Sequence, residues 1–230
     1  MKITAIKPFV LDAGIYVKIE TDEGIYGLGE GGMKRRGRAI AEVIHSMAPD
    51  LIGQDPFRIE HLWQVMFRGG FFPGGVVQSA AVSAVDIALW DLKAKRAGLP
   101  LYKLLGGFRD RVPAYLMQQA IPYEDTLKTA QQAVDEGYHG FKDHSMLGLE
   151  TNLALAKDIR DLVGDDMVLM HDPVQQYSVD EAIKVSRRLE ELDYLWIEEP
   201  LQEFDINGLK RLSDAVDLPV MALESIQGNP

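Results

Sequence analysis

The sequence contains no cysteine among its 230 residues, which excludes disulfides, thiolate nucleophiles and cysteine-bound zinc. No apolar run reaches the roughly 18 residues of a membrane span, and the first residues lack the apolar stretch of a signal peptide. Basic residues are also scarce, with 24 Lys and Arg against 35 Asp and Glu and a net charge of −11. Because phosphate contacts need a basic face, nucleic acid is a poor partner. We therefore expect a cytoplasmic globular protein that binds neither membranes nor nucleic acid.

The residues up to about 110 predict an α+β domain. Three strand-like stretches separated by turns indicate an antiparallel meander, and these are Ile3 to Val10, Tyr16 to Glu20 and Ile25 to Leu28. Helical periodicity follows, most clearly from Gln78 to Ala97, where Gly98 is expected to end the helix. Strands and helices in separate blocks are typical of an α+β fold.

From residue 111 onward, short apolar strands alternate with amphipathic helices. The predicted strands are Ala114–Met117, Gly140–Lys142, Met167–His171, Tyr194–Ile197 and Val220–Leu223. The predicted helices begin near Asp125, Glu150, Ser178 and Asp205, and Ser178 with Glu181 predicts a capping box. Repeated βα units require parallel strands with right-handed crossovers, in either a doubly wound sheet or a TIM-type barrel. A complete barrel has eight strands and about 250 residues, so five strands here would make a partial (β/α) barrel.

Carboxylates occupy equivalent places at the ends of three predicted strands. Asp172, Glu198 and Glu224 follow one another at intervals of 26 residues, one βα unit each. This spacing predicts three acidic groups at one height on adjacent strands, about 4.8 Å apart, where α/β proteins build their sites. Mg²⁺ would relieve their repulsion and favours oxygen ligands. An acidic residue after a strand is also often a helix cap or a surface group, and Glu199 is an alternative ligand, although strand alternation lets only one of Glu198 and Glu199 point inward.

Several motifs together resemble the mandelate racemase/muconate lactonizing enzyme family of the enolase superfamily. They are Trp196-Ile197-Glu198-Glu199-Pro200, the segment Ala84 to Lys93, the segment Leu101 to Gly107, and the hairpin Thr21 to Gly24 with Gly27 to Glu30. The resemblance covers nearly the whole chain. It implies an α+β capping domain over residues 1–110, followed by a modified TIM-type barrel that here is incomplete, over residues 111–230.

The resemblance also implies a chemistry: Mg²⁺-assisted abstraction of the proton next to a carboxylate, through an enediolate intermediate. Acid-sugar dehydration is the first expectation, and racemisation or epimerisation is the alternative. The family often carries a Lys-x-Lys base motif at the end of the second barrel strand. Here Lys142 matches the first lysine and His144 replaces the second, so both are the candidate catalytic residues. Without the resemblance, the alternative interpretation is that Lys142 is a solvated charge and His144 is a loop histidine.

Substrate binding is expected from the basic segment Gly31 to Arg38, in particular from Lys34, Arg35 and Arg36. Their charges would suit an acid sugar as the small-molecule substrate. The alternative is a solvated basic run before a helix. A further departure from the family is Val174, which stands where the Asp-x-Asn pattern after Asp172 has an amide.

The family's remaining acid and base groups would lie on later strands. We therefore expect a fragment of an enzyme that is a homo-oligomer at full length. The competing hypothesis is a catalytically silent fragment, or a half-barrel that needs a partner chain. A doubly wound phosphate-binding protein is disfavoured because none of the βα units from residue 111 onward has a G-x-G-x-x-G loop between its strand and its helix.

Overall fold

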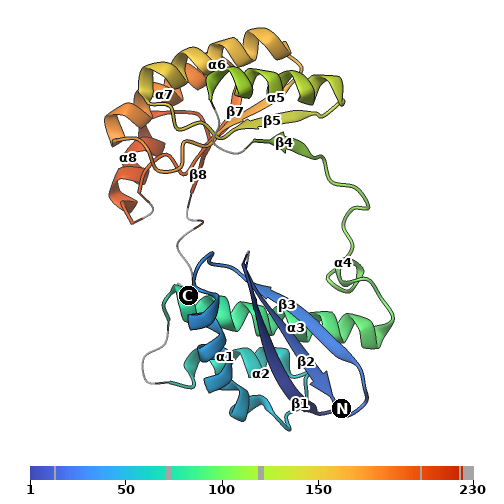
Figure 1. Cartoon of the computed structure of the whole chain (residues 1–230). Helices are drawn as coiled ribbons and strands as arrows, with labels where there is room; N and C mark the ends of the chain where they lie inside the picture. The colour runs from blue at the N-terminus through green and yellow to red at the C-terminus, as the bar shows by residue number, and fades with distance from the viewer. Residues whose placement is uncertain (13, 71–73, 119–121, 203, 223, 225–230) are drawn as a thin grey trace. The chain divides into compact units, whose positions relative to one another are not determined.

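The computed structural model describes residues 1–12, 14–70, 74–118, 122–202, 204–222 and 224. The chain divides into two compact units, Met1–Asp110 and the part that starts at Arg111 (Figure 1). No helix in the described ranges is both long enough and apolar enough to cross a membrane.

The first unit packs helices against an antiparallel sheet. Its strands are β1 (Ile3–Leu11), β2 (Gly14–Thr21) and β3 (Tyr26–Gly31), in the order β1-β2-β3. Its helices are α1 (Gly37–Leu51), α2 (Ile59–Arg68), α3 (Val76–Ala97) and α4 (Leu101–Leu104). The predicted meander is confirmed. Alternate residues of β2, namely Ile15, Val17 and Ile19, are fully buried, because a strand turns every second side chain toward the core.

Glycines let β3 lie directly on α3. A Cβ atom on Gly29 would come within 2.0 Å of the carbonyl oxygen of Ala84, and one on Gly27 within 1.9 Å of that of Ala88. Such distances are far inside van der Waals contact, so only glycine allows this approach. Asp91 on α3 fixes the strand further by accepting a hydrogen bond from the Leu28 amide at 2.8 Å.

The second unit is an alternating series of parallel strands and helices. The strands are β4 (Tyr115–Met117), β5 (Gly140–Asp143), β6 (Val168–His171), β7 (Tyr194–Glu198) and β8 (Val220–Met221). The helices are α5 (Tyr123–Asp135), α6 (Leu149–Val163), α7 (Val179–Glu191) and α8 (Ile206–Ala215). All five predicted strands and all four helices are present, and Ser178 with Glu181 forms the predicted capping box. Leu223, the last residue of the predicted fifth strand, lies outside the described residues.

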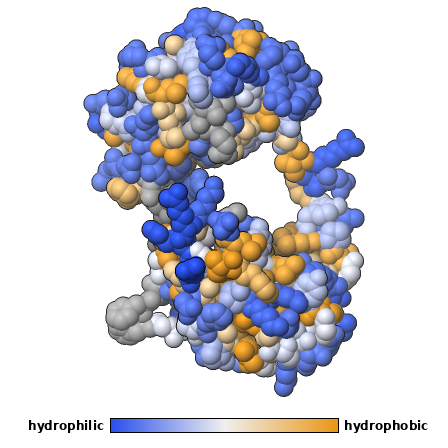
Figure 2. Space-filling view, in the orientation of Figure 1, coloured by the Kyte–Doolittle hydropathy of each residue, from blue (hydrophilic) through white to orange (hydrophobic). Residues whose placement is uncertain are grey.

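The strands are hydrogen-bonded in chain order, β4-β5-β6-β7-β8, and every pair is parallel. The helices cover one face of this sheet (Figure 1). Phe141, Leu169 and Ile197 project toward them and are fully buried. The exterior of this helical layer in Figure 2 is mainly hydrophilic, as expected of amphipathic helices that bury their apolar side. A doubly wound sheet would need a reversal of strand order, and the described part of the chain shows none.

The opposite face of the sheet is open within the described part of this unit. Tyr115, Val168 and Leu195 lie there and are 40–48% exposed. They border a hollow of about 330 Å³ whose lining also includes Met170 and Trp196. The second unit therefore has one apolar face in contact with helices and a second apolar face available for contact.

Candidate active site at the carboxyl ends of the parallel strands

Three strand ends bring one ammonium group and two carboxylates together. Lys142 on β5 donates from Nζ to Asp172 Oδ2 at 3.1 Å and to Glu198 Oε1 at 2.9 Å. Asp172 directly follows β6, and Glu198 is the last residue of β7. The side chains of Lys142, Asp172 and Glu198 are only 9%, 9% and 15% exposed. Two carboxylates on neighbouring strands thus share one position that holds a positive charge.

The surroundings of Lys142 favour its charged form. Burial alone would lower the pKa of Lys142, but the hydrogen bonds to Glu198 and Asp172 outweigh it, so the pKa lies above that of an ordinary lysine. In this arrangement Lys142 is a cation that offsets the two carboxylates.

His144 lies on the other side of Asp172. Its Nε2 atom is 3.6 Å from Asp172 Oδ2, which is longer than a hydrogen bond. Its Nδ1 atom is buried and has no hydrogen-bond partner among the described residues. Lys142 and His144 are two residues apart, so both face the carboxylates. The structure brings together four of the five residues predicted for catalysis and metal binding: Lys142, His144, Asp172 and Glu198.

Both oxygens of Glu198 are engaged, since Oε2 accepts a hydrogen bond from Trp196 Nε1 at 3.1 Å. Glu199 is also buried, but its backbone is left-handed, with φ at 41°. β7 ends at Glu198, so the alternation expected for a strand does not extend to Glu199. Glu199 instead accepts a hydrogen bond from the Glu224 amide at 2.7 Å.

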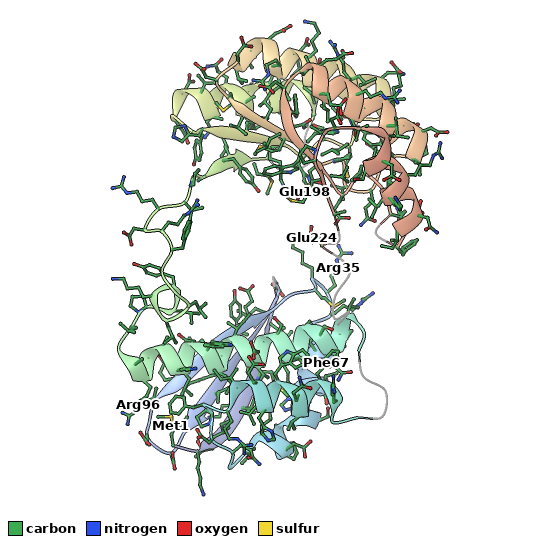
Figure 3. The ribbon with its side chains drawn as sticks, turned by 180° about the vertical axis from the view of Figure 1, so that it is seen from behind. Met1, Arg35, Phe67, Arg96, Glu198 and Glu224 are labelled. Atoms are coloured by element: carbon green, nitrogen blue, oxygen red, sulfur yellow. The ribbon has the colours of Figure 1, made fainter. Side chains whose placement is uncertain are left out.

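Glu224 is placed differently from the expectation that it ends a strand. β8 stops at Met221, because only Val220 and Met221 join the ladder, and Glu224 is exposed beyond it (Figure 3). Within the described residues, no three acidic or histidine side chains converge closely enough to form a metal cluster. Asp172 and Glu198 both bind the Lys142 ammonium, and Glu224 is tied to this region through its backbone rather than its carboxylate.

The candidate substrate-binding residues Lys34, Arg35 and Arg36 belong to the first unit. They lie between β3 and α1, all three are exposed, and Arg35 has a left-handed backbone with φ at 67°. No ion pair is formed by these three side chains with the part of the chain that the structure describes.

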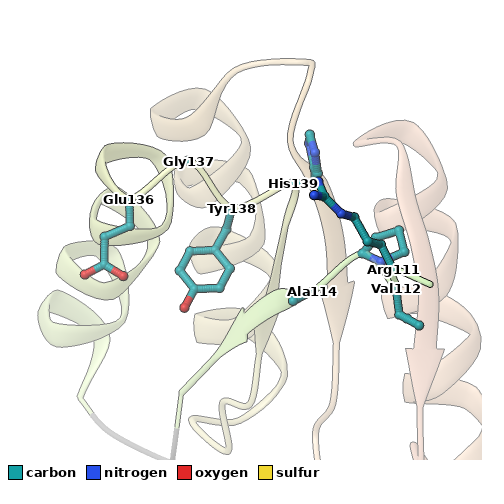
Figure 4. A pocket seen from close by; sticks show the side chains of 8 residues that line it. Arg111, Val112, Ala114, Glu136, Gly137, Tyr138 and His139 are labelled. Atoms are coloured by element: carbon teal, nitrogen blue, oxygen red, sulfur yellow. The ribbon is translucent and has the colours of Figure 1, made fainter.

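A surface hollow of about 480 Å³ lies at the opposite ends of the strands. Its lining includes Arg111 and Ala114 before β4, and Glu136, Tyr138 and His139 before β5 (Figure 4). Catalytic groups on parallel α/β units gather at the carboxyl ends of strands, whereas residues at the amino ends serve stability. This hollow is therefore separate from the candidate active site.

Sequence reasoning missed a set of buried polar side chains behind the site. Asp143 and His171 are 0% and 1% exposed, and His171 Nδ1 lies 2.9 Å from Asp143 Oδ2. The available signal was their position: each is a polar residue in an apolar strand, on the face that carries Phe141 and Leu169.

Residues 4–106 match the family described as mandelate racemase / muconate lactonizing enzyme, N-terminal domain, and residues 125–229 match the family described as enolase C-terminal domain-like. The chain belongs to the mandelate racemase/muconate lactonizing enzyme family of the enolase superfamily. The family resemblance read from the sequence is confirmed, and so is a fold with a capping domain and a barrel-like parallel sheet.

The names of similar proteins, or of their bound ligands, include sugar acids. The chain is 37% identical to a D-galactonate dehydratase from Verminephrobacter eiseniae, over 97% of its own length and 62% of that protein. The crystal structure of 3,6-anhydro-D-galactonate cycloisomerase from Zobellia galactanivorans matches with a TM-score of 0.87 and 35% identity, over 97% of this chain and 66% of that one. A Pantoea ananatis enolase with bound D-gluconate and Mg matches with a TM-score of 0.87 and 28% identity, over 96% of this chain and 65% of that one. The chain therefore spans less than two thirds of the length of these proteins.

Proposed function

We propose that the polypeptide carrying this sequence is a Mg²⁺-dependent acid-sugar dehydratase. The observation that carries the proposal is the position shared by Asp172 and Glu198, where two carboxylates hold one positive charge and His144 lies beside them. The sugar acids in the names of the similar dehydratase and of the ligand in the similar enolase support the substrate class.

The proposal includes the architecture: residues 1–110 as the capping domain and residues 111–230 as the first five strands of a (β/α) barrel. Two features of the second unit support it. Its strands follow chain order with helices on one face, which is the winding of a barrel. The other face is apolar and open in the described residues, as the inner wall of a barrel would be before its remaining strands are added.

We assign the metal to Asp172 and Glu198, with Glu224 as the third ligand. All three donors are carboxylate oxygens, which Mg²⁺ prefers, and the first two already share a cation position. The bound metal would hold the substrate carboxylate and stabilise the negative charge of the enediolate. The Glu224 backbone is anchored by Glu199, which keeps the residue close to the end of β7.

The chain's own residues divide the work of proton removal. His144 is proposed as the base because imidazole exchanges protons near neutral pH and its buried Nδ1 atom has no partner in the described residues. Lys142 is proposed to keep its proton, since its pKa is raised, and to donate hydrogen bonds to the substrate carboxylate. The carbon next to that carboxylate loses its proton to His144, and the bonding pair is delocalised into the carboxylate.

We keep Lys34, Arg35 and Arg36 as candidates for attracting the substrate. They place three positive charges on one exposed segment of a protein whose net charge is −11. Local positive charge of this kind offsets the repulsion that an acidic protein exerts on an anionic substrate.

The test uses the polypeptide at its full natural length, with Mg²⁺, on D-galactonate, D-gluconate and their C2 epimers. Dehydration of such acids yields a 2-keto-3-deoxy acid, which is expected with at least one substrate. His144→Asn is expected to lower kcat by about 10² to 10⁴-fold, whereas His45→Asn on the exposed side of α1 serves as the matched control.

Interconversion of the C2 epimers without any keto acid would assign the racemase or epimerase reaction instead. If His144→Asn were as active as the wild type, His144 could not be the base. Absence of turnover on every sugar acid would refute the proposed dehydratase activity.

A further inference from the structure

A continuous set of buried polar groups lies behind the active-site strand ends, between the sheet and the helices. It joins the ends of β5 and β6, the first turn of α6 and the loop after β6. Its members are all less than a tenth exposed, and they are Asp143, Ser145, Asn152, His171 and Tyr177.

The hydrogen bonds in this set lead to Asp143 from two sides. Asn152 Nδ2 donates to the Tyr177 hydroxyl at 2.6 Å, and that hydroxyl lies 3.1 Å from His171 Nε2. Burial raises the pKa of Tyr177, so its hydroxyl keeps the proton that it donates to His171. The tautomer with its hydrogen on Nδ1 gives both ring nitrogens of His171 a partner, since Nδ1 then donates to Asp143 Oδ2 and Nε2 accepts from Tyr177. Ser145 donates to the second Asp143 oxygen. Each carboxylate oxygen of Asp143 thus has a donor.

Strand alternation links this set to the active site. In Lys142-Asp143-His144 the outer two side chains face Asp172, while Asp143 faces the helices. On the neighbouring strand, His171 faces the helices and Asp172 the site. Asp143 and His171 are paired in the β5–β6 ladder, and the Asp172 amide donates to the Asp143 carbonyl at 2.8 Å. The Asp143–His171 contact therefore joins the two strand ends at the point from which Lys142, His144 and Asp172 project.

The loop that begins at Asp172 is held by the same set. Asp172 Oδ1 accepts a hydrogen bond from the Val174 amide at 3.2 Å, which leaves Oδ2 for the cation. Tyr177 closes the loop, since its amide donates to the Pro200 carbonyl at 3.1 Å and its hydroxyl reaches His171. The orientation of the Asp172 carboxylate thus depends on a loop whose far end rests on His171.

A buried pair of this kind is weak evidence of a stabilising role, because its replacement by well-packed apolar residues is often neutral or stabilising. Groups that orient metal ligands, by contrast, change metal affinity by about 10 to 100-fold when removed. We propose that Asp143 and His171 are positioning residues, which fix the ends of β5 and β6 so that Lys142, His144 and Asp172 meet at the cation position. This proposal rests on the proposed function of that site.

The test compares two replacements of His171 that each copy one ring nitrogen. Asn copies Nδ1 and can still donate to Asp143, whereas Gln copies Nε2 and cannot. Mg²⁺ affinity, measured by calorimetric titration, is expected to stay within about threefold in His171→Asn and to fall by about 10 to 100-fold in His171→Gln. Tyr194→Phe is the matched control for a general loss of a buried hydrogen bond, because the Tyr194 hydroxyl donates to the Ala156 carbonyl at 3.1 Å outside this set. Its Mg²⁺ affinity is expected to equal that of the wild type.

Equal Mg²⁺ affinities in His171→Gln and the wild type would overturn the positioning role while leaving the proposed function intact. Absence of Mg²⁺ binding by the wild type would refute the proposed function itself. A second measurement needs no variant: the His171 Nδ1 hydrogen should give a slowly exchanging downfield NMR line that moves when Mg²⁺ is added. A line that is absent, or that does not respond to saturating Mg²⁺, would also contradict the proposal.

Discussion

Lys142→Met is the substitution that probes the cation position most directly. It keeps the side chain unbranched and only one atom shorter, and it removes the charge that lies 3.1 Å from Asp172 and 2.9 Å from Glu198. All three side chains are at most 15% exposed, so two buried carboxylates would be left without their cation. Breaking a buried ion pair by removing one partner costs about 3–5 kcal/mol. In a chain of this size, that corresponds to a fall in Tm of roughly 6–20 °C.

The prediction has a second half that concerns Mg²⁺. If the metal occupies the position of the Lys142 ammonium, it should again offset the charges of Asp172 and Glu198. Added Mg²⁺ should therefore stabilise Lys142→Met more than the wild type. Thermal unfolding followed by circular dichroism, with and without Mg²⁺, measures both effects. Lys157→Met is the matched control, since Lys157 pairs with Asp161 on the exposed side of α6, and surface pairs of this kind contribute only about 0.3–0.5 kcal/mol. The reasoning would be refuted if Lys142→Met were as stable as the control without Mg²⁺, or if Mg²⁺ stabilised it no more than the wild type.

Three further predictions concern metal binding, packing and pH. Glu198→Gln should abolish the rise in Tm caused by Mg²⁺, whereas Glu199→Gln should retain it, because the amide oxygen can still accept the backbone N–H that Glu199 accepts; the reverse pattern would reassign the ligand. Gly29→Ala should destabilise the first unit by about 1–3 kcal/mol, because its Cβ would clash with α3, while Gly32→Ala, which meets nothing within 4 Å, should be nearly neutral in urea unfolding. The capping-box hydrogen bonds lower the pKa of Glu181. Its contribution to stability is therefore complete above the pKa of the unfolded chain, about 4.3, and is lost as the pH falls through the lower pKa of the folded state. Below about pH 4.3 the free energy of unfolding should fall less steeply in Glu181→Gln than in the wild type, and an equal slope would contradict this.

Much of the second unit was predictable because its signals are local. Each strand is a short apolar run, and each helix has its own start signal, such as the Ser178–Glu181 box. The grouping of Asp172 and Glu198 followed from the parallel arrangement, which brings successive strand ends to one edge. Lys142 and His144 were named from the family resemblance, which places its base motif at the end of the second barrel strand.

The remaining features depend on contacts between distant residues. Glu224 was expected at the height of Asp172, but β8 pairs over only Val220 and Met221, and the length of a ladder is set by its neighbours. Lys142 was named as a candidate catalytic residue, but its hydrogen bonds to two carboxylates that are 30 and 56 residues away could not be read from its local sequence. Asp143 and His171 find each other across 28 residues, a pairing that no local pattern contains.

The alternation along Lys142-Asp143-His144 places strict limits on insertions and deletions. Neighbouring residues of this tripeptide lie in two separate environments. Lys142 and His144 lie in the candidate active site, and Asp143 lies in the buried hydrogen-bonded set. Loss or gain of a single residue within β5 would exchange the two sets, directing Asp143 into the reaction site and a lysine or histidine among the helices. Length variation among related chains should therefore fall in the following loop, from Met146 to Gly148, and spare the strand and Ser145. For protein engineering, residues on one face of this strand can be substituted without altering the other face, whereas an insertion or deletion would alter both faces.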